Sequence, residues 1–403
     1  MGYVPAILLA AHILSMLGSQ TYAALLPQLR EEWGMSNAQA GVVGGMFFAG
    51  YIATVSYWTA LTDRVDGRKV YLAGGVIAAA GGIGFGVAAS GFYTGILFQS
   101  LLGVGVAATY MPGLRILSDR ISGASQSRYI AFYTSFFGIG TALSLAIAGM
   151  VAPVWGWPAA FIVSALGPLA AGILVFVFIE KKEITGKKAA FSLGTLFPVS
   201  AWRKVLAIRA AAGYTLGYFV HCLELFGSRA WMVAFLAFSA GLHAGESTFP
   251  WQLPAIAAVV NLVSVPASIV GNEIALRIGR QKWITIAMAG SGACGILLGF
   301  SAPWFWGLVM ALLIVYSMLI MAESATLTAG LVAAAPAELR GAAMGLYSLC
   351  GFAGGMLGPM IYGVALDAAG GAGSHGAWIA GYAAIGAGCL VAPLVVRISR
   401  SPR

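Results

Sequence analysis

Long apolar runs recur from one end of the 403-residue chain to the other, and they limit its possible folds more than any other feature. A run of about 18 or more apolar residues can cross a bilayer of about 30 Å as a helix. Charged residues make up only 9% of the chain, about a third of the fraction in a soluble domain. The pattern therefore predicts an all-α membrane protein that crosses the bilayer many times.

Twelve transmembrane helices are expected, with a polar stretch between the sixth and the seventh. The N-terminal run has no basic residues before it, so we interpret it as the first span rather than a cleaved signal peptide. The seventh is too long for one crossing and is expected either to project beyond the membrane or to break. The expected limits are 5–29, 38–62, 70–90, 92–116, 128–152, 157–179, 207–238, 252–274, 283–302, 304–333, 342–366 and 377–397.

Basic residues indicate the orientation, because they favour the cytoplasmic side. If twelve helices alternate, one side collects nearly all Lys and Arg and the other keeps only Arg30. Both termini are then cytoplasmic, in what we expect to be a bacterial inner membrane. The charged stretch 181–205 is predicted to link an N-terminal six-helix bundle (1–180) to a C-terminal one (206–403). Its segment FSLGTLFPVSAW is expected to lie along the membrane surface.

The two halves resemble each other, which is typical of transporters built from a duplicated unit. Laying HILSMLGSQTY (12–22) over HCLELFGSRAW (221–231) aligns His12 with His221. Gly18 then meets Gly227, and an aromatic residue ends both segments. The net charge of +9 comes from basic residues interleaved with the apolar runs, so it does not indicate a nucleic-acid partner.

The stretch ALTDRVDGRKVYLAGG stands between the second and third expected helices. An acidic residue at a helix end, followed by a glycine turn with basic residues, resembles the signature loop of the major facilitator superfamily. The resemblance implies two six-helix bundles, alternating access and a conformational latch, in which Asp63 meets a helix N-terminus or an arginine in one state only. The alternative is that the basic residues only set topology. The latch residues are Asp63, Arg64, Gly67, Arg68 and Lys69.

Polar side chains inside the apolar runs are predicted to form the transport site, because an ionisable group in hydrocarbon needs a partner or a wet cavity. The resemblance implies that helices one, four, seven and ten line a central cavity. Glu224, His221 and Glu323 are predicted to carry protons, and a carboxyl without a cationic partner could exchange them near neutral pH. The planar fork of Arg229 suits a carboxylate or a similar anion. The predicted substrate-binding residues are Arg229, Arg115, His12, Gln20, Tyr22 and Trp231.

Structural interpretations stay open for the same residues. Glu224 could be neutralised by Arg229 or by Arg115. Arg115 could instead bond Asp119, and the two histidines could be packing residues. His221 and Glu224 have the spacing of two metal ligands, but no third ligand lies nearby, so no metal site is expected.

No polar loop carries a nucleophile elbow, a phosphate-binding loop or a metal-ligand spacing, so we expect no enzyme and no cofactor. The leading hypothesis is a monomeric, proton-coupled carrier of a small anion or carboxylate, surrounded by membrane lipid. The chain loosely resembles prokaryotic nitrate/nitrite or cyanate-type permeases. The alternatives are a proton-driven multidrug or metabolite exporter, and a non-transporting membrane receptor or scaffold.

Overall fold

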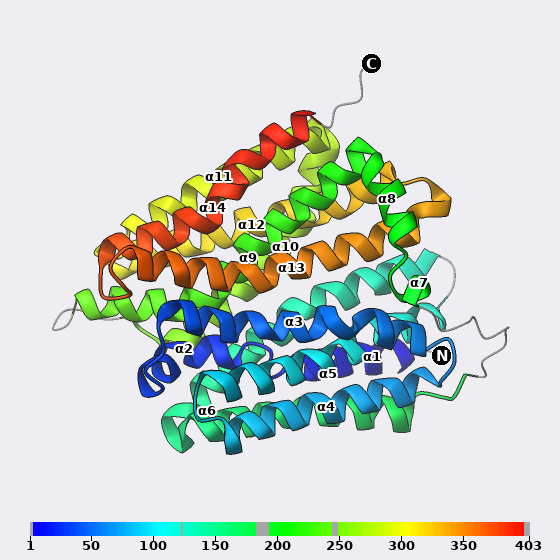
Figure 1. Cartoon of the computed structure of the whole chain (residues 1–403), viewed down its shortest axis with the longest axis horizontal. Coiled ribbons are helices and arrows are strands. Elements are labelled where there is room, and N and C mark those ends of the chain that lie inside the picture. The colour runs from blue at the N-terminus through cyan, green and yellow to red at the C-terminus, as the bar shows by residue number, and fades with distance from the viewer. Residues whose placement is uncertain (1–2, 122–123, 183–192, 244–248, 399–403) are drawn as a thin grey trace. The chain divides into compact units, whose positions relative to one another are not determined.

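A computed structural model describes residues 3–121, 124–182, 193–243 and 249–398 (Figure 1). Within these ranges the chain is all-helical and has no strand, which confirms the all-helical part of the predicted fold class, while the count of twelve spans stays a prediction. The helices are α1 Tyr3–Met16, α2 Thr21–Glu32, α3 Asn37–Leu61, α4 Gly67–Ala88, α5 Phe92–Ser118, α6 Ala124–Phe178, α7 Leu193–Leu196, α8 Val199–Ala207, α9 Arg209–Leu242, α10 Leu253–Ile278, α11 Arg280–Phe300, α12 Trp306–Ala334, the short η1 Ala337–Leu339, α13 Arg340–Ala368 and α14 His375–Ile398.

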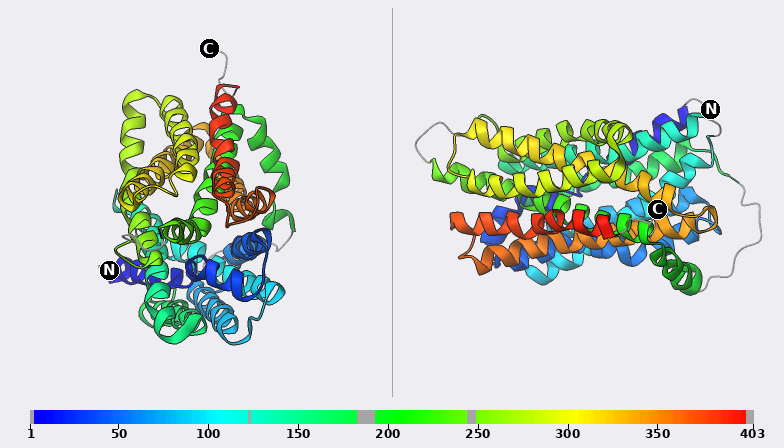
Figure 2. Two further views of the ribbon diagram at one scale, coloured as in Figure 1. Left: turned by 90° about the vertical axis from the view of Figure 1, so that its left-hand side faces the viewer. Right: turned by 90° about the horizontal axis from the view of Figure 1, so that it is seen from above.

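The chain divides into two compact units. Unit 1 comprises Met1–Leu25 and Met46–Phe197, and unit 2 comprises Leu26–Gly45 and Pro198–Arg403. In unit 1, α4 packs against α5 and α6, and α1 packs against α6. In unit 2, α9 packs against α12, α13 and α14, while α11 packs against α14 (Figure 2). Each unit is therefore a helical bundle with its own internal packing.

The prediction of one continuous helix over 5–29 is wrong. α1 ends at Met16 and α2 begins at Thr21, with Gly18 between them at φ +100°. Glycine adopts this backbone conformation without a steric penalty. The amide N–H groups of Gly18 and Gln20 both donate to Ser144 Oγ on α6, each at 3.0 Å. The break therefore keeps its backbone donors satisfied inside the unit.

Two further expectations concern long helices. The expected separation between 152 and 157 is confirmed, because Gly156 interrupts the α6 segment with φ 82° and ψ 163°. The seventh helix does not break, so that alternative is wrong. α9 runs through 34 residues without interruption, a length of about 51 Å.

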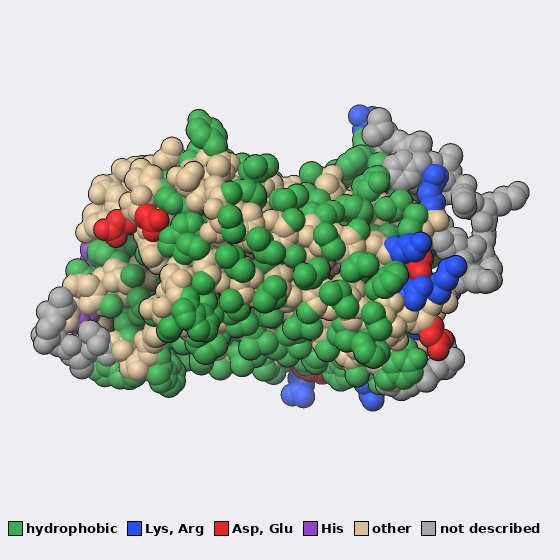
Figure 3. Space-filling model, turned by 90° about the horizontal axis from the view of Figure 1, so that it is seen from below, with side chains coloured by type: hydrophobic (Ala, Val, Ile, Leu, Met, Phe, Trp, Pro, Cys, Tyr) green, Lys and Arg blue, Asp and Glu red, His purple; other side chains and the backbone are tan. Residues whose placement is uncertain are grey.

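Ten helical segments among the described residues are long and apolar enough to cross a membrane. Large apolar side chains on their surfaces are exposed, including Val87 at 73% and Ile269 at 62%. Figure 3 shows one face on which hydrophobic side chains cover the middle, while Lys and Arg gather toward one end. Such a surface fits a multi-pass membrane protein, since an aqueous protein rarely exposes so large an apolar area.

Arg30, the basic residue expected alone on its side, belongs to a hydrogen-bonded cluster in unit 2. Its Nη1 donates to Asn37 Oδ1 at 2.7 Å. Asn37 Nδ2 donates to Asp367 Oδ1 at 2.7 Å, and the carboxylate also accepts from the backbone N–H groups of Asn37 and Ala38. Asp367 on α13 thereby caps the N-terminus of α3, where a negative charge is favourable.

Candidate functional site

Unit 2 buries ionisable side chains in the middle of α9. His221 is 1% exposed, Glu224 is fully buried and Arg229 is 5% exposed. Side chains of this kind are rarely buried unless they have partners. The partners of each one therefore indicate what the site can do.

His221 pairs with Glu323 of α12 in the interior of unit 2. The distance between His221 Nδ1 and Glu323 Oε1 is 3.0 Å, and Glu323 is fully buried. The other carboxyl oxygen, Glu323 Oε2, has no hydrogen-bond partner within the described ranges. Either the imidazole or the carboxyl can hold the shared proton, depending on the protonation state. The pair can therefore share one proton, and its role in proton transport stays a prediction.

Glu224 lies about 60° around α9 from His221 and contacts a different helix. Its Oε2 accepts a hydrogen bond from Ser291 Oγ of α11 at 2.7 Å. Its Oε1 has no hydrogen-bond partner in the described part of the chain, and a Cβ at Gly386 of α14 would lie 3.7 Å from it. Glu224 forms no ion pair with Arg229 in the described structure, so that proposed neutralising pair is wrong. The proposed pairing of Glu224 with Arg115, which belongs to unit 1, stays a prediction.

Arg229 is buried without a carboxylate. Its only hydrogen-bond contact among the residues that the structure describes is from Nη2 to Met321 Sδ, at 3.8 Å. A thioether sulfur is a weak acceptor, and arginine stays charged in proteins. A buried guanidinium without a counter-ion is unfavourable, so this side chain is suited to bind an anion.

The pair of His221 and Glu323 lies along the contact between α9 and α12, and so does Arg229. Arg229 follows His221 by eight residues, about 12 Å along the helix axis. Its contact, Met321, precedes Glu323 by two residues on α12. The guanidinium of Arg229 and the His221–Glu323 pair therefore share one helix interface inside unit 2.

Unit 1 contains a different environment around His12. The imidazole is fully buried and stacks on Tyr133, with ring centroids 4.1 Å apart and planes 15° apart. Tyr110 lies on another side at 5.2 Å. Neither ring nitrogen of His12 has a hydrogen-bond partner within the described ranges. In contrast to His221, His12 packs among aromatic rings, and its predicted role in substrate binding stays a prediction.

The remaining buried candidates pack in the cores of their units. Gln20 is 7% exposed, and its backbone N–H is bonded to Ser144. Tyr22 contacts Phe85 edge to face, with a centroid distance of 6.2 Å. Trp231 is fully buried and donates its indole N–H to Pro359 O at 3.0 Å. Substrate contacts by these three residues stay predictions.

The signature loop is tied to the helices of unit 1. Arg115 Nη2 lies 2.6 Å from Asp63 Oδ1, and Arg115 Nη1 donates to Thr62 Oγ1 at 2.8 Å. The alternative bond from Arg115 to Asp119 is wrong, because Asp119 pairs with Lys182 instead. Arg115 thus lies with the loop, and its role in substrate binding stays a prediction.

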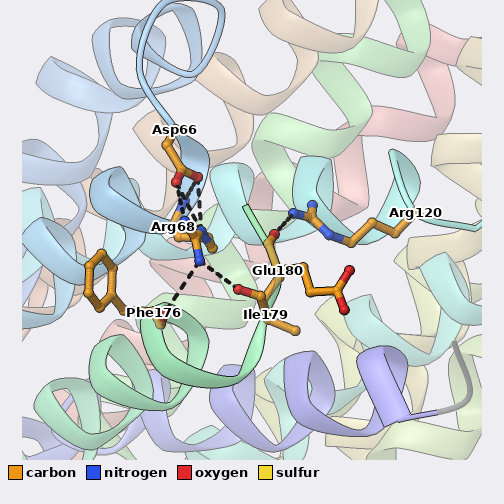
Figure 4. Close-up of polar contacts among 6 residues, drawn as sticks. All are labelled: Asp66, Arg68, Arg120, Phe176, Ile179 and Glu180. Atoms are coloured by element: carbon orange, nitrogen blue, oxygen red, sulfur yellow. Dashed lines mark hydrogen bonds and ion pairs between the residues drawn. The ribbon is translucent and has the colours of Figure 1, made fainter. Parts of the chain in front are cut away.

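Asp66, which the sequence analysis did not select, organises the other half of the loop (Figure 4). It caps α4 by accepting from the backbone N–H of Arg68, and its Oδ2 accepts from Arg68 Nη2 at 2.7 Å. Arg68 Nη1 also donates to Ile179 O, beyond the end of α6, at 2.8 Å. Burial alone would raise the pKa of the Asp66 carboxyl, but the hydrogen bonds and charge of Arg68 bring that pKa below its ordinary value.

A sequence signal for Asp66 existed, because it directly precedes the first residue of α4, where aspartate is a preferred cap. Arg120 acts beside it, donating from Nη2 to Glu180 O at 2.6 Å (Figure 4). Gly67 starts α4 close to α5, and a Cβ there would lie 3.1 Å from Ile116 Cγ1. Arg64 is half-buried and Lys69 is exposed. A latch function of this loop stays a prediction.

Metal binding has no visible basis in the parts of the chain that are described. They contain no group of three or more His, Cys, Asp or Glu side chains that could hold an ion.

Comparison with known proteins decides the family. The family model for the Major Facilitator Superfamily matches residues 8–359. The chain belongs to the Major Facilitator Superfamily. This confirms the resemblance seen in the signature loop, and membership of a transporter family supports the predicted non-enzymatic role.

The curated relatives are transporters with low sequence identity. The gentisate transporter of Corynebacterium glutamicum is 25% identical over 86% of this chain and 77% of its own length. The niacin transporter NiaP of Acinetobacter baylyi is 24% identical over 40% of this chain, and the match spans only 35% of NiaP. The multidrug resistance protein MdtL of Shewanella oneidensis is 26% identical over 43% of each chain.

Solved structures share the fold over nearly the whole chain. The nucleoside transporter NupG superposes with a TM-score of 0.78 at 14% identity, covering 99% of this chain and 100% of NupG. A bacterial homologue of the human lysosomal transporter Spinster gives 0.74 at 14% identity, covering 99% and 95%. At these identities the likeness establishes the fold alone.

Proposed function

We propose that this protein is a proton-coupled secondary carrier that moves a small organic anion or carboxylate across a membrane by alternating access. The observation that carries the proposal is Arg229. It is a buried arginine with no carboxylate partner in the described structure, and it lies in a transporter fold. A substrate carboxylate would supply the missing counter-ion through two parallel N–H···O bonds.

The pair of His221 and Glu323 supports the coupling to protons. A negative charge bound at Arg229 would favour a proton on the pair, because both lie along the contact of α9 and α12. Binding of either ligand then promotes binding of the other, and this reciprocity is what a coupled carrier needs. Glu224, hydrogen-bonded to Ser291 of α11, would be a second proton-binding group.

The relatives support a small organic acid as substrate. The gentisate and niacin transporters are named for small ring-containing carboxylic acids, and the gentisate transporter matches most of this chain. The substrate class of this protein is inferred from Arg229 and these names together.

The membrane arrangement is part of the same proposal. α1 and α2 would form one span, α6 two spans divided at Gly156, and α14 the last of twelve. Two bundles of six helices would then be joined through 181–205. The basic residues favour cytoplasmic termini in a bacterial inner membrane, and a monomer would suffice for transport.

The test uses proteoliposomes that enclose a pH-sensitive dye. Gentisate, nicotinate and other small carboxylates are added one at a time, followed by lipophilic cations. We expect proton movement with at least one carboxylate, loss of that movement in Glu323→Gln, and loss of uptake in Arg229→Ala. Arg277→Ala is the matched control, since Arg277 is an exposed arginine near the end of α10 in the same unit. Normal carboxylate uptake by Arg229→Ala would contradict the proposal that Arg229 binds the transported anion.

A proton-driven multidrug exporter is the second candidate. The match to MdtL supports it, as do Glu224 Oε1 and Glu323 Oε2, two buried carboxyl oxygens without partners in the described residues. In that case lipophilic cations would move protons and carboxylates would not. Arg229 would then be a structural residue.

A further inference from the structure

The short helix α8 is held on the body of unit 2 by one of its sides. Val205 is fully buried in a cluster that includes Ala211 and Ile284, and Trp202 packs against the same cluster. α8 contacts α13 and the start of α9, as Figures 1 and 2 show. Its opposite surface is therefore fixed in orientation.

That opposite surface has an apolar part and a basic part. Val199 is 50% exposed and Leu206 is 49% exposed. They are seven residues apart, so they lie within about 20° of each other around the helix. Arg203, also exposed, lies about 40° from Val199, and exposed Lys204 extends the basic part.

Acidic side chains in the described part of the chain do not neutralise the basic part. The described residues from 193 to 209 contain no Asp or Glu, and Arg209, at the start of α9, is exposed as well. Arg203, Lys204 and Arg209 form no ion pair with any residue that the structure describes. Arg203 therefore faces outward beside two half-exposed aliphatic side chains, and Lys204 and Arg209 add two further exposed positive charges nearby in the chain.

The place of α8 in the chain identifies what can cover this surface. α9 begins two residues after α8 and is a candidate membrane span from Arg209 onward. Water would leave Val199 and Leu206 exposed, and hydrocarbon would leave the basic groups without solvation. The bilayer interface suits both, because acyl chains meet the apolar part and headgroups meet the basic part.

We propose that the outer surface of α8 (Val199, Arg203, Lys204 and Leu206, with Arg209) is a binding site for anionic phospholipid headgroups. The charge of the site is complementary to phosphatidylglycerol and not to the zwitterionic phosphatidylcholine. The site holds the α8 end of unit 2 at the membrane surface. This inference rests on α8 and the membrane fold, not on the transported substrate.

The test measures thermal unfolding of the full-length protein in detergent, titrated with phosphatidylglycerol or phosphatidylcholine. We expect phosphatidylglycerol to raise the melting temperature of the wild type and phosphatidylcholine to raise it much less. The double variant R203Q/K204Q should need roughly tenfold more phosphatidylglycerol for half of the effect, since each basic group near an anionic surface contributes to binding. The single variant Arg203→Lys keeps the positive charge and should therefore respond to phosphatidylglycerol like the wild type.

Two control variants separate the site from total charge. R277Q/K282Q removes two exposed basic groups of the same unit and should respond like the wild type. Leu206→Gln keeps all charges and should weaken the response, because the apolar part is lost. An equal response of R203Q/K204Q and the wild type would overturn the proposal. Equal stabilisation of the wild type by polyglutamate and by phosphatidylglycerol would also overturn it, because the partner would then be an acidic peptide.

Discussion

His12 of unit 1 and His221 of unit 2 occupy matching places in two similar sequence segments, yet their surroundings differ. Both are buried and both stack on a tyrosine, Tyr133 for His12 and Tyr218 for His221. His221 also has a carboxyl partner, Glu323, whereas His12 has no hydrogen-bond partner among the described residues. The interior of unit 2 contains ionisable groups, whereas unit 1 has aromatic packing at the equivalent place.

The charged residues of unit 1 lie at helix ends instead. Asp63 pairs with Arg115, and Asp66 pairs with Arg68, both in or beside the signature loop. Charges at helix ends can be solvated, whereas charges in a bundle interior need a partner or a ligand. The proposed ligand and proton chemistry is therefore assigned to unit 2, while the polar contacts of unit 1 fasten its helices together.

Removing Arg229 should have the largest effect on transport. In Arg229→Ala we expect the affinity for a transported carboxylate to fall by roughly thirtyfold or more, because truncating a buried, charge-paired partner costs about 2–5 kcal/mol. Uptake of labelled substrate over a concentration series measures the change. Arg115→Ala provides the comparison in unit 1, and an equal loss there would show that the anion site is not confined to unit 2.

His221→Phe should destabilise the protein by about 1–3 kcal/mol. The substitution keeps an aromatic ring beside Tyr218 but leaves the buried Glu323 carboxyl without its partner. Thermal unfolding in detergent measures the change, together with the pH dependence of transport. A variant as stable as the wild type, with an unchanged pH profile, would contradict the proton-holding role of this pair.

The matched change in unit 1, His12→Phe, should be neutral or stabilise by up to about 1 kcal/mol. It removes two ring nitrogens that lack partners in the described residues and keeps the stack on Tyr133. The same unfolding measurement decides it. A loss as large as that in His221→Phe would show that the two histidines are equivalent after all.

Asp66→Asn should cost about 1 kcal/mol at neutral pH, since it weakens the α4 cap and the pairing with Arg68. The pKa of Asp66 in the folded protein lies below its ordinary value. Its contribution is therefore complete above the ordinary aspartate pKa and is lost as pH falls through the lowered one. Unfolding of wild type and variant from pH 7 down to pH 3 should show a difference that shrinks with acid. A constant difference would mean that the carboxylate charge is unimportant.

Much of the fold could be predicted, because apolar runs of membrane length leave the chain few alternatives to helices. α3, for example, spans Asn37–Leu61 against a predicted 38–62. The break near Gly18 was missed, since it depends on Ser144 of α6, which is 126 residues away. A short sequence window does not contain the group that satisfies such a turn.

The residues of the candidate site were predicted from the sequence, but their interaction partners were not. His221, Glu224, Arg229 and Glu323 stood out as polar residues in apolar runs, and all four are buried. Their partners were not predictable, because Ser291 is an ordinary helix residue. Glu224 and Arg229 are close in the sequence but lie about 140° apart around α9, so they do not face each other.

The sequence by itself determined that this protein belongs to the Major Facilitator Superfamily, a family of helical membrane transporters. Hydropathy and a signature loop are properties of contiguous residues, so they can be recognised without coordinates. Only the tertiary structure decided which buried groups are paired. His221 meets Glu323 across 102 residues of chain, and Arg229 meets no carboxylate in the described structure. Pairing depends on which faces of α9, α11 and α12 meet, and that is set by packing of the whole unit.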